Sequence, residues 1–331
     1  MAAGRPTLNP DLIALTGIKP SGEPHLGNYL GMIRPALALA GNYRTFYFIA
    51  DYHALTTLHD GAELRRLTRV IAATWLALGL DPERTLLYRQ SDVPQIPELA
   101  WILSCFTPKG LLDRAHAFKD ARAKNQEVSA GLHFYPVLMS ADILAFRAHA
   151  VPVGRDQKQH VEICRDIALA FNHVYGDILT PPEPLIQAAV QTIPGIDGRK
   201  MSKSYGNTLP LFAPPQALRK RVFQIQTDSS PVEAPKDPDQ AVVFQIYRCF
   251  AAPDESAQLA ARLRAGGLGW AVVKQALADA LERQLAEPRR RYQQLLADEP
   301  ELDRLLADGG ERARALAAGL LDEVRRAVGV R

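Results

Sequence analysis

Short apolar runs alternate with amphipathic stretches over the first two thirds of the chain, and this alternation constrains the fold most. Stretches with helical spacing lie at residues 27–40, 62–78 and 157–171. Strands that are apolar throughout and separated by helices predict a parallel sheet with both faces covered. Four runs have the length and composition of such strands: Ile13–Ile18, Tyr43–Ile49, Thr85–Tyr88 and Val151–Val153.

The pattern changes after Ser204. Residues 216–331 are rich in Ala, Leu, Arg and Glu with helical spacing, and only residues 228–240 predict a long loop. We therefore predict an α/β fold, in which a Rossmann-like, parallel-sheet nucleotide-binding domain (1–205) precedes a smaller all-helical domain (206–331). The first domain would carry a helical insert around 95–145. Within it, residues 113–129 predict a mobile loop, and Pro181–Pro184 predicts a connector.

Composition limits the partners and the compartment. The net charge is +2 up to residue 210 (21 basic and 19 acidic residues) and +1 after it (18 and 17), so charge alone does not indicate nucleic acid. His160 and Cys164 offer only two metal ligands, and no bound zinc or iron–sulfur cluster is expected. Without a long apolar run or a signal-peptide pattern, we expect a cytoplasmic protein that does not enter a membrane. The three cysteines, Cys105, Cys164 and Cys249, lie far apart without paired spacing, so a disulfide framework is not expected and a reducing compartment fits.

A glycine- and proline-rich turn, Thr16–Gly22, follows the first predicted strand and leads into Pro24–Asn28. In an open α/β sheet, ligands bind where strands end, and free amides at a helix start favour phosphate. Glycine lets the backbone approach a nucleotide closely, and His25 or Asn28 can donate to a phosphate oxygen. The same residues also fit a plain turn with a polar cap, so this segment alone leaves both interpretations open.

A second candidate motif is Lys200–Ser204, which follows Asp197-Gly198-Arg199. Two ammonium groups and two hydroxyls within five residues suit a polyphosphate whose charge shifts during a reaction. The alternative is an exposed basic loop without a ligand. The upstream glycine-rich turn in an α/β domain favours the phosphate interpretation.

Together these motifs resemble the signatures of the class I aminoacyl-tRNA synthetases. Residues 24–28 are similar to the histidine–glycine signature in its HLGN form, and Lys200–Ser204 matches KMSKS letter for letter. Tyr135–Asp142 and Val151–His160 resemble the tryptophanyl branch. The resemblance implies catalytic roles for His25, Lys200 and Lys203. It further implies ATP contacts, with Mg²⁺, from Lys19, Pro20, Ser21, Gly27, Asn28, Gly154, Arg155, Asp156, Val190, Lys200, Met201, Ser202, Lys203 and Ser204.

The resemblance also implies a tryptophan pocket, in which Asp142 accepts the indole N–H and Gln157 holds the backbone end of the amino acid. If Pro136 lies in the first turn of a helix, Met139 and Asp142 share one face. Without the resemblance, a structural salt bridge from Asp142 to Arg147 is the favoured alternative. The residues implied to bind tryptophan are His53, Tyr135, Met139, Asp142, Val153 and Gln157.

The chain departs from the common family pattern at three positions. Leu15 stands where many relatives have an aromatic residue, Lys19 where they have Gln, and Arg155 where Glu is frequent. The predicted mobile loop offers three cations, any of which could reach ATP: Lys119, Arg122 and Lys124.

The implied reaction uses ATP to join L-tryptophan to tRNA(Trp). The resemblance also implies that residues 206–331 bind the anticodon and that the protein is a homodimer. Three alternatives remain: a tyrosyl-tRNA synthetase, a non-catalytic tRNA-binding or regulatory paralogue, and a small-molecule nucleotidyltransferase. The Met139/Asp142 pair favours tryptophan over tyrosine, and two lysines on one loop favour catalysis. The cations predicted to contact tRNA are Arg219, Lys220, Arg221 and Arg289–Arg291.

Overall fold

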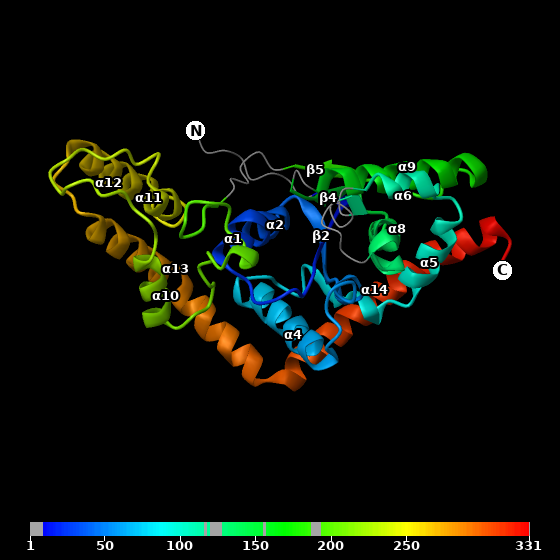
Figure 1. Cartoon of the computed structure of the whole chain (residues 1–331). Helices are drawn as coiled ribbons and strands as arrows, with labels where there is room; N and C mark the ends of the chain where they lie inside the picture. Colours follow the sequence, from blue (N-terminus) through cyan, green and yellow to red (C-terminus); the bar gives the residue numbers. More distant parts are fainter. Residues whose placement is uncertain (1–8, 116–117, 120–127, 155–156, 187–192, 331) are drawn as a thin grey trace.

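The computed structural model describes residues 9–115, 118–119, 128–154, 157–186 and 193–330. Five parallel strands form one sheet in the order β3-β2-β1-β4-β5 (Figure 1). This is a doubly wound order, with its switch point between β1 and β4. The predicted α/β class with a parallel sheet is confirmed. The strands are β1 (Asn9–Ile18), β2 (Tyr43–Ile49), β3 (Leu86–Arg89), β4 (Ala150–Pro152) and β5 (Glu183–Leu185).

The fifth strand was not predicted, because its prolines indicated a connector. Glu183 donates its backbone N–H to the carbonyl of His149 at 2.8 Å, and β5 pairs in parallel with β4. Proline removes a backbone donor, which an edge strand tolerates on its unpaired side. Since β5 ends the strand order, Pro184 can lie within it.

Helices cover both faces of the sheet, as the apolar strands predict. Along β2, Phe46 and Phe48 belong to one hydrophobic core, while Tyr47 and Ile49 belong to another on the opposite face. The helices that follow the first four strands are α1 (Leu26–Asn28), α2 (Arg34–Leu39), α3 (Asp51–Ala54), α4 (Gly61–Ala77), α5 (Gln95–Ser104), α6 (Lys109–Asp113), α8 (Ala130–Leu144) and α9 (Lys158–Tyr175). A π-helical turn, Tyr29–Ile33, joins α1 to α2, and a 3₁₀ turn, Gln90–Asp92, follows β3.

Helix α8 begins earlier than the sequence predicted. The Ser129 hydroxyl accepts a hydrogen bond from the Leu132 N–H at 3.1 Å and caps the helix. Pro136 therefore lies inside α8, and its predicted place in the first turn is wrong. The Ser140 hydroxyl donates to the Pro136 carbonyl at 2.8 Å.

The C-terminal part is helical, as predicted, but its last helix returns to the sheet. The helices are α10 (Pro215–Phe223), α11 (Val242–Tyr247), α12 (Pro253–Ala265), α13 (Trp270–Ala297) and α14 (Glu299–Val328). Helices α10 to α13 share a core with Leu26 and Met201, whereas α14 crosses β3 and α5 (Figure 1). The division at residues 205 and 206 stays a prediction. None of the described helices combines the length and apolar character that a membrane crossing requires.

Candidate active site

The glycine-rich turn after β1 places His25 at the start of α1. The His25 backbone N–H donates to Asn28 Oδ1 at 3.1 Å, and the Leu26 N–H donates to the Leu209 carbonyl at 2.9 Å. Burial, followed by the positive charge of Lys203, lowers the pKa of His25 to about 4. The imidazole is therefore neutral at neutral pH. Its Nδ1 is buried and has no hydrogen-bond partner within the described residues.

The second motif lies directly against the first. The Gly27 N–H lies 3.2 Å from Met201 Sδ, and Lys203 Nζ lies 3.0 Å from where a Cβ on Gly22 would be. Gly22 has a φ of +129°, a conformation that favours glycine. Burial lowers the pKa of Lys203, while Glu23 opposes the shift. The two motifs thus form one cationic surface, to which Lys200 adds an exposed side chain.

Sequence reasoning missed Asn207, which holds the second motif in shape. Its side chain is buried and accepts from the Ser202 N–H at 2.8 Å. Its amide also donates to Asp197 Oδ1 at 2.7 Å and to the Lys200 carbonyl at 3.1 Å. Asparagine close after a polar loop was the available signal, since its amide can bond to backbone groups in turns.

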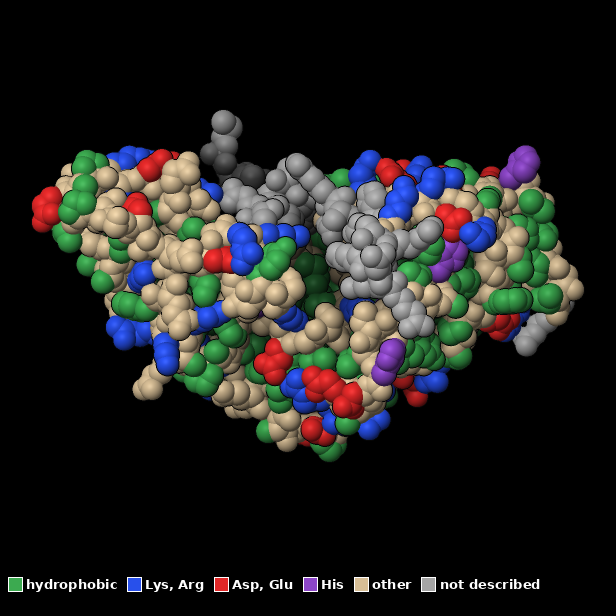
Figure 2. Space-filling view, in the orientation of Figure 1, with side chains coloured by type: hydrophobic (Ala, Val, Ile, Leu, Met, Phe, Trp, Pro, Cys, Tyr) green, Lys and Arg blue, Asp and Glu red, His purple; other side chains and the backbone are tan. Residues whose placement is uncertain are grey.

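A cavity of about 490 Å³ opens at the carboxyl ends of β1 and β4. This is the switch point of the sheet, where open α/β folds bind ligands. Figure 2 shows that the visible face is hollowed near its centre, with hydrophobic side chains at depth. All six side chains predicted to bind tryptophan line the cavity, together with Lys19 and Gly154: His53, Tyr135, Met139, Asp142, Val153 and Gln157.

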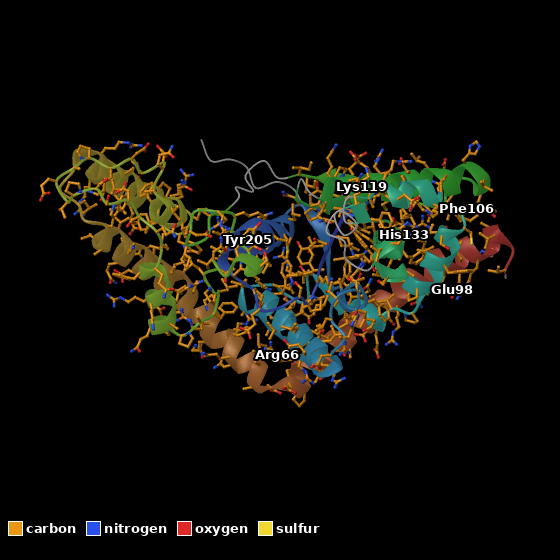
Figure 3. The ribbon with its side chains drawn as sticks, in the orientation of Figure 1. Arg66, Glu98, Phe106, Lys119, His133 and Tyr205 are labelled. Atoms are coloured by element: carbon orange, nitrogen blue, oxygen red, sulfur yellow. The ribbon has the colours of Figure 1, made fainter. Side chains whose placement is uncertain are left out.

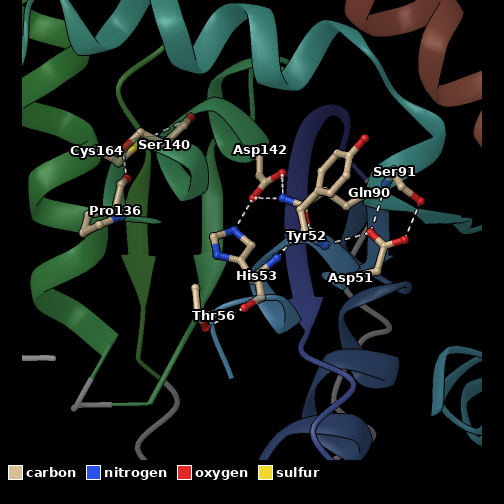
Figure 4. Close-up of polar contacts among 10 residues, drawn as sticks. All are labelled: Asp51, Tyr52, His53, Thr56, Gln90, Ser91, Pro136, Ser140, Asp142 and Cys164. Carbon is tan, nitrogen blue, oxygen red and sulfur yellow. Dashed lines mark hydrogen bonds and ion pairs between the residues drawn. The ribbon is translucent and has the colours of Figure 1, made fainter. Parts of the chain in front are cut away.

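Asp142 is the buried carboxylate of this cavity (Figure 4). It accepts from His53 Nε2 at 2.8 Å and from Gln90 Nε2 at 2.8 and 3.0 Å. Burial raises the pKa of Asp142, and the hydrogen bond and charge of His53 oppose the shift. Arg147 instead pairs with Glu323 at 2.7 Å, so the alternative salt bridge between Arg147 and Asp142 is wrong.

Gln90 was also missed by sequence reasoning. It directly follows β3, and a polar residue after a buried parallel strand was the available signal.

Several of the other residues predicted to contact ATP lie in or near the two motifs. The Lys19 ammonium donates a hydrogen bond to the Thr56 hydroxyl at 2.9 Å, and burial lowers the pKa of Lys19. The Ser21 N–H donates to the Lys19 carbonyl at 2.8 Å and closes the turn. Pro20 is buried in this turn, and the Ser202 and Ser204 hydroxyls lie 2.9 Å apart. Arg155, Asp156, Val190, Arg122 and Lys124 lie outside the described residues.

Lys119 is exposed. Tyr205 is the last residue of the 3₁₀ turn that begins in the second motif. Figure 3 shows Lys119 and His133 on one side of the sheet and Tyr205 on the other. The described residues contain no group of three or more His, Cys, Asp or Glu side chains that could hold a metal ion.

Comparison with known proteins identifies the family. The family model described as "tRNA synthetases class I (W and Y)" matches residues 7–286. A tryptophan–tRNA ligase of Xanthomonas axonopodis pv. citri is 52% identical over 329 residues, covering 96% of this chain and 76% of that protein. The tryptophan–tRNA ligase of Neisseria meningitidis is 49% identical over 328 residues, covering 96% and 97%.

Among solved structures, tryptophanyl-tRNA synthetase from Campylobacter jejuni, complexed with ADP and tryptophan, is similar with a TM-score of 0.91. It is 42% identical, and the match covers 96% of this chain and 100% of that chain. The family match spans both motifs and the cavity. The chain belongs to the class I tRNA synthetases that act on tryptophan and tyrosine, and it is an aminoacyl-tRNA synthetase.

Proposed function

We propose that this enzyme is a tryptophan–tRNA ligase. It activates L-tryptophan with ATP to tryptophanyl-adenylate and pyrophosphate, then transfers tryptophan to tRNA(Trp). The observation that carries the choice of tryptophan is the buried Asp142 in a cavity otherwise lined mainly by apolar side chains. The two relatives named tryptophan–tRNA ligase, at 52% and 49% identity, support the same choice.

In the proposed complex the indole ring fills the cavity between Met139 and Val153. Its N–H donates to the acceptor position of Asp142 that His53 and Gln90 leave open, because a buried acceptor position without a donor is costly. Tyr135 and His53 border the ring, and their own rings lie 6.0 Å apart in an edge-to-face arrangement. Gln157 lies at the mouth of the cavity, where it would hold the ammonium and carboxylate end of the amino acid.

ATP enters as its magnesium complex and lies across the contact between the two motifs. An oxygen of the tryptophan carboxylate attacks the α-phosphorus, and the bond to the bridging oxygen of pyrophosphate breaks. The chain contributes mainly position and charge. Neutral His25 donates a hydrogen bond to phosphate, and the ammonium groups of Lys200 and Lys203 stabilise the charge that moves onto pyrophosphate.

Assembly, location and domain roles belong to the same proposal. We place the enzyme in the cytoplasm as a homodimer, in which residues 1–205 catalyse and residues 206–331 bind the anticodon region of tRNA. The exposed apolar side chains of Trp101 on α5 and of Leu169 and Val174 on α9 are candidates for contacts in this dimer.

The test is amino-acid-dependent ATP–pyrophosphate exchange, run with all twenty amino acids. Tryptophan alone should support rapid exchange, and a preference for tyrosine would overturn the assignment. In Asp142→Ala, exchange with tryptophan should fall sharply, while the weak rate with phenylalanine, which has no donor, should barely change. Asp142→Asn keeps an acceptor and should fall between. If Asp142→Ala keeps full selectivity, the carboxylate is only structural.

A further inference from the structure

We propose that Gln90 is a positioning residue that fixes the Asp142 carboxylate and thereby sets the preference of the cavity for an indole N–H. This inference rests on the proposed function of Asp142. Gln90 is fully buried, and it does not itself line the cavity. Its side chain lies between the backbone that follows β2 and the carboxylate on α8 (Figure 4).

The hydrogen bonds of Gln90 determine which way its amide faces. Its Oε1 accepts from the backbone N–H groups of Tyr52 at 3.1 Å and His53 at 3.4 Å. Because only the carbonyl end of an amide can accept, the NH₂ end must face Asp142. That end donates to both carboxylate oxygens, at 2.8 and 3.0 Å. A reversed amide would place its oxygen against the carboxylate.

The backbone around Gln90 is held by a second contact. Asp51 Oδ1 accepts from the N–H groups of Tyr52 and Ser91, each at 3.0 Å, and the Ser91 hydroxyl donates to Asp51 Oδ2. This carboxylate therefore joins the turn after β2 to the turn after β3. Gln90 is fixed on both sides, so its amide is a rigid support for Asp142.

A rigid carboxylate can discriminate between donors by their position. Gln90 and His53 direct three hydrogen bonds to Asp142, and a carboxylate accepts about four. The remaining acceptor direction is therefore fixed relative to the apolar walls. An indole N–H at the ring edge meets it, whereas phenylalanine leaves it unpaired. A carboxylate released from Gln90 would change its direction and lose this selectivity.

The first test is Gln90→Leu, which keeps much of the volume and removes both ends of the amide. We expect kcat/KM for tryptophan in the exchange reaction to fall roughly 10- to 100-fold, mainly through KM, because misplacement of about 1 Å can cost that much. The rate with phenylalanine should change little, so the ratio between the two substrates falls. The matched control is Thr45→Val, which breaks the buried 2.9 Å hydrogen bond between Thr45 and Thr85 near the other end of β2 and β3. It should lower stability and leave the ratio unchanged.

The second test is Gln90→Glu, which gives a pH signature that a merely structural role would not. A protonated Glu donates to Asp142 and restores the support, whereas an ionised Glu repels it. Activation of tryptophan by this variant, relative to wild type, should therefore improve as the pH falls. The other titratable groups facing this position are His53, Asp51 and Tyr88, and all three are present in the wild-type reference.

Asp142→Ala in the same assays distinguishes the positioning role of Gln90 from the role of Asp142 in the pocket. If Asp142→Ala loses selectivity while Gln90→Leu keeps it, the positioning role of Gln90 is wrong and the pocket assignment stands. If both variants keep the preference for tryptophan, the pocket assignment itself fails. Should Gln90→Leu not fold, a flat pH dependence of Gln90→Glu relative to wild type would overturn the inference.

Discussion

Lys203 belongs to the second signature motif and contacts the glycine-rich turn that precedes the first. Its ammonium lies against Gly22, and burial lowers its pKa. If it meets pyrophosphate mainly in the transition state, Lys203→Ala should lower kcat more than it raises the KM values. Losing one such charged contact costs on the order of 3 kcal/mol, roughly a hundredfold in rate. Lys200→Ala should behave in the same way.

Steady-state exchange kinetics with varied ATP would measure these effects. Lys109→Ala is a suitable control, because Lys109 is exposed and pairs only with Asp113 on its own helix, among the contacts described. Near-normal kcat in both signature variants would contradict the assignment.

His25 gives the unliganded protein a pH-dependent stability. Its pKa is about 4 when folded, below the ordinary value of 6.5. The unfolded chain therefore binds a proton as the pH falls below 6.5, whereas the folded protein does not until about pH 4. Stability from this group is complete above pH 6.5 and is lost as the pH falls between these values. His25→Gln should remove this contribution.

Denaturant unfolding of the two proteins at pH 7 and pH 5, without ATP, would measure the difference. The stability of wild type relative to His25→Gln should be lower at pH 5. An equal difference at both pH values would show that His25 is not shielded in the folded state.

Sequence could indicate the acids, cations and rings of the site, but not the side chains that hold them. Asp142 and Lys203 belong to motifs with chemical meaning, and the structure brings each to the cavity or to the contact between motifs. Gln90 gains its importance from a partner far away in the chain, whereas Asn207 holds its own loop through residues five to ten positions away. Gln90 contacts Asp142 across 52 positions, and no local pattern encodes such a contact.

At the scale of elements, helix α14 depends on two glycines to reach the sheet. A Cβ on Gly309 would lie 1.8 Å from the Leu87 carbonyl oxygen, and one on Gly310 would lie 2.6 Å from the Asp92 side chain. Gly309→Ala should force α14 away from β3 and destabilise the protein by about 3 kcal/mol or more. Gly319 lies on the same helix with nothing within 4 Å of its Cβ position. Gly319→Ala should stabilise the protein by about 0.5–1 kcal/mol, since alanine favours a helix.

Chemical denaturation of both variants would check the contrast between them. Equal effects would mean that α14 does not pack on β3 as described.

Strong periodicity made several elements predictable. Tyr43–Ile49 has the predicted bounds, and the helix predicted at 62–78 lies at Gly61–Ala77. The π-helical turn at Tyr29–Ile33 could not be predicted, because a single shifted hydrogen-bond register leaves the hydrophobic pattern almost unchanged. The same is true of α14, whose periodicity predicts a helix but not the surface it covers.

At the scale of the whole molecule, the structure divides the cations that sequence had grouped as contacts for tRNA. Arg289 is buried and pairs with Glu282 at 3.0 Å, so it is a structural residue. Arg221 Nε donates to the Thr208 carbonyl at 3.0 Å, next to the second motif, and therefore supports that loop. Arg290 is exposed but pairs with Glu287 on the same helix. Arg219, Lys220 and Arg291 are exposed and remain candidates.

Replacing these three exposed residues with Ala should weaken tRNA binding while leaving ATP–pyrophosphate exchange unchanged, because exchange needs no tRNA. Each lost phosphate contact should lower the slope of log affinity against log salt by about 0.7–0.9. Arg289→Ala should instead lower the unfolding midpoint, because Glu282 loses its partner. Aminoacylation kinetics and binding at several salt concentrations would distinguish these effects. Because the net charge is near zero, tRNA binding should depend on a few well-placed cations. A triple variant that charges tRNA normally, with an unchanged salt slope, would therefore show that tRNA binds to another surface.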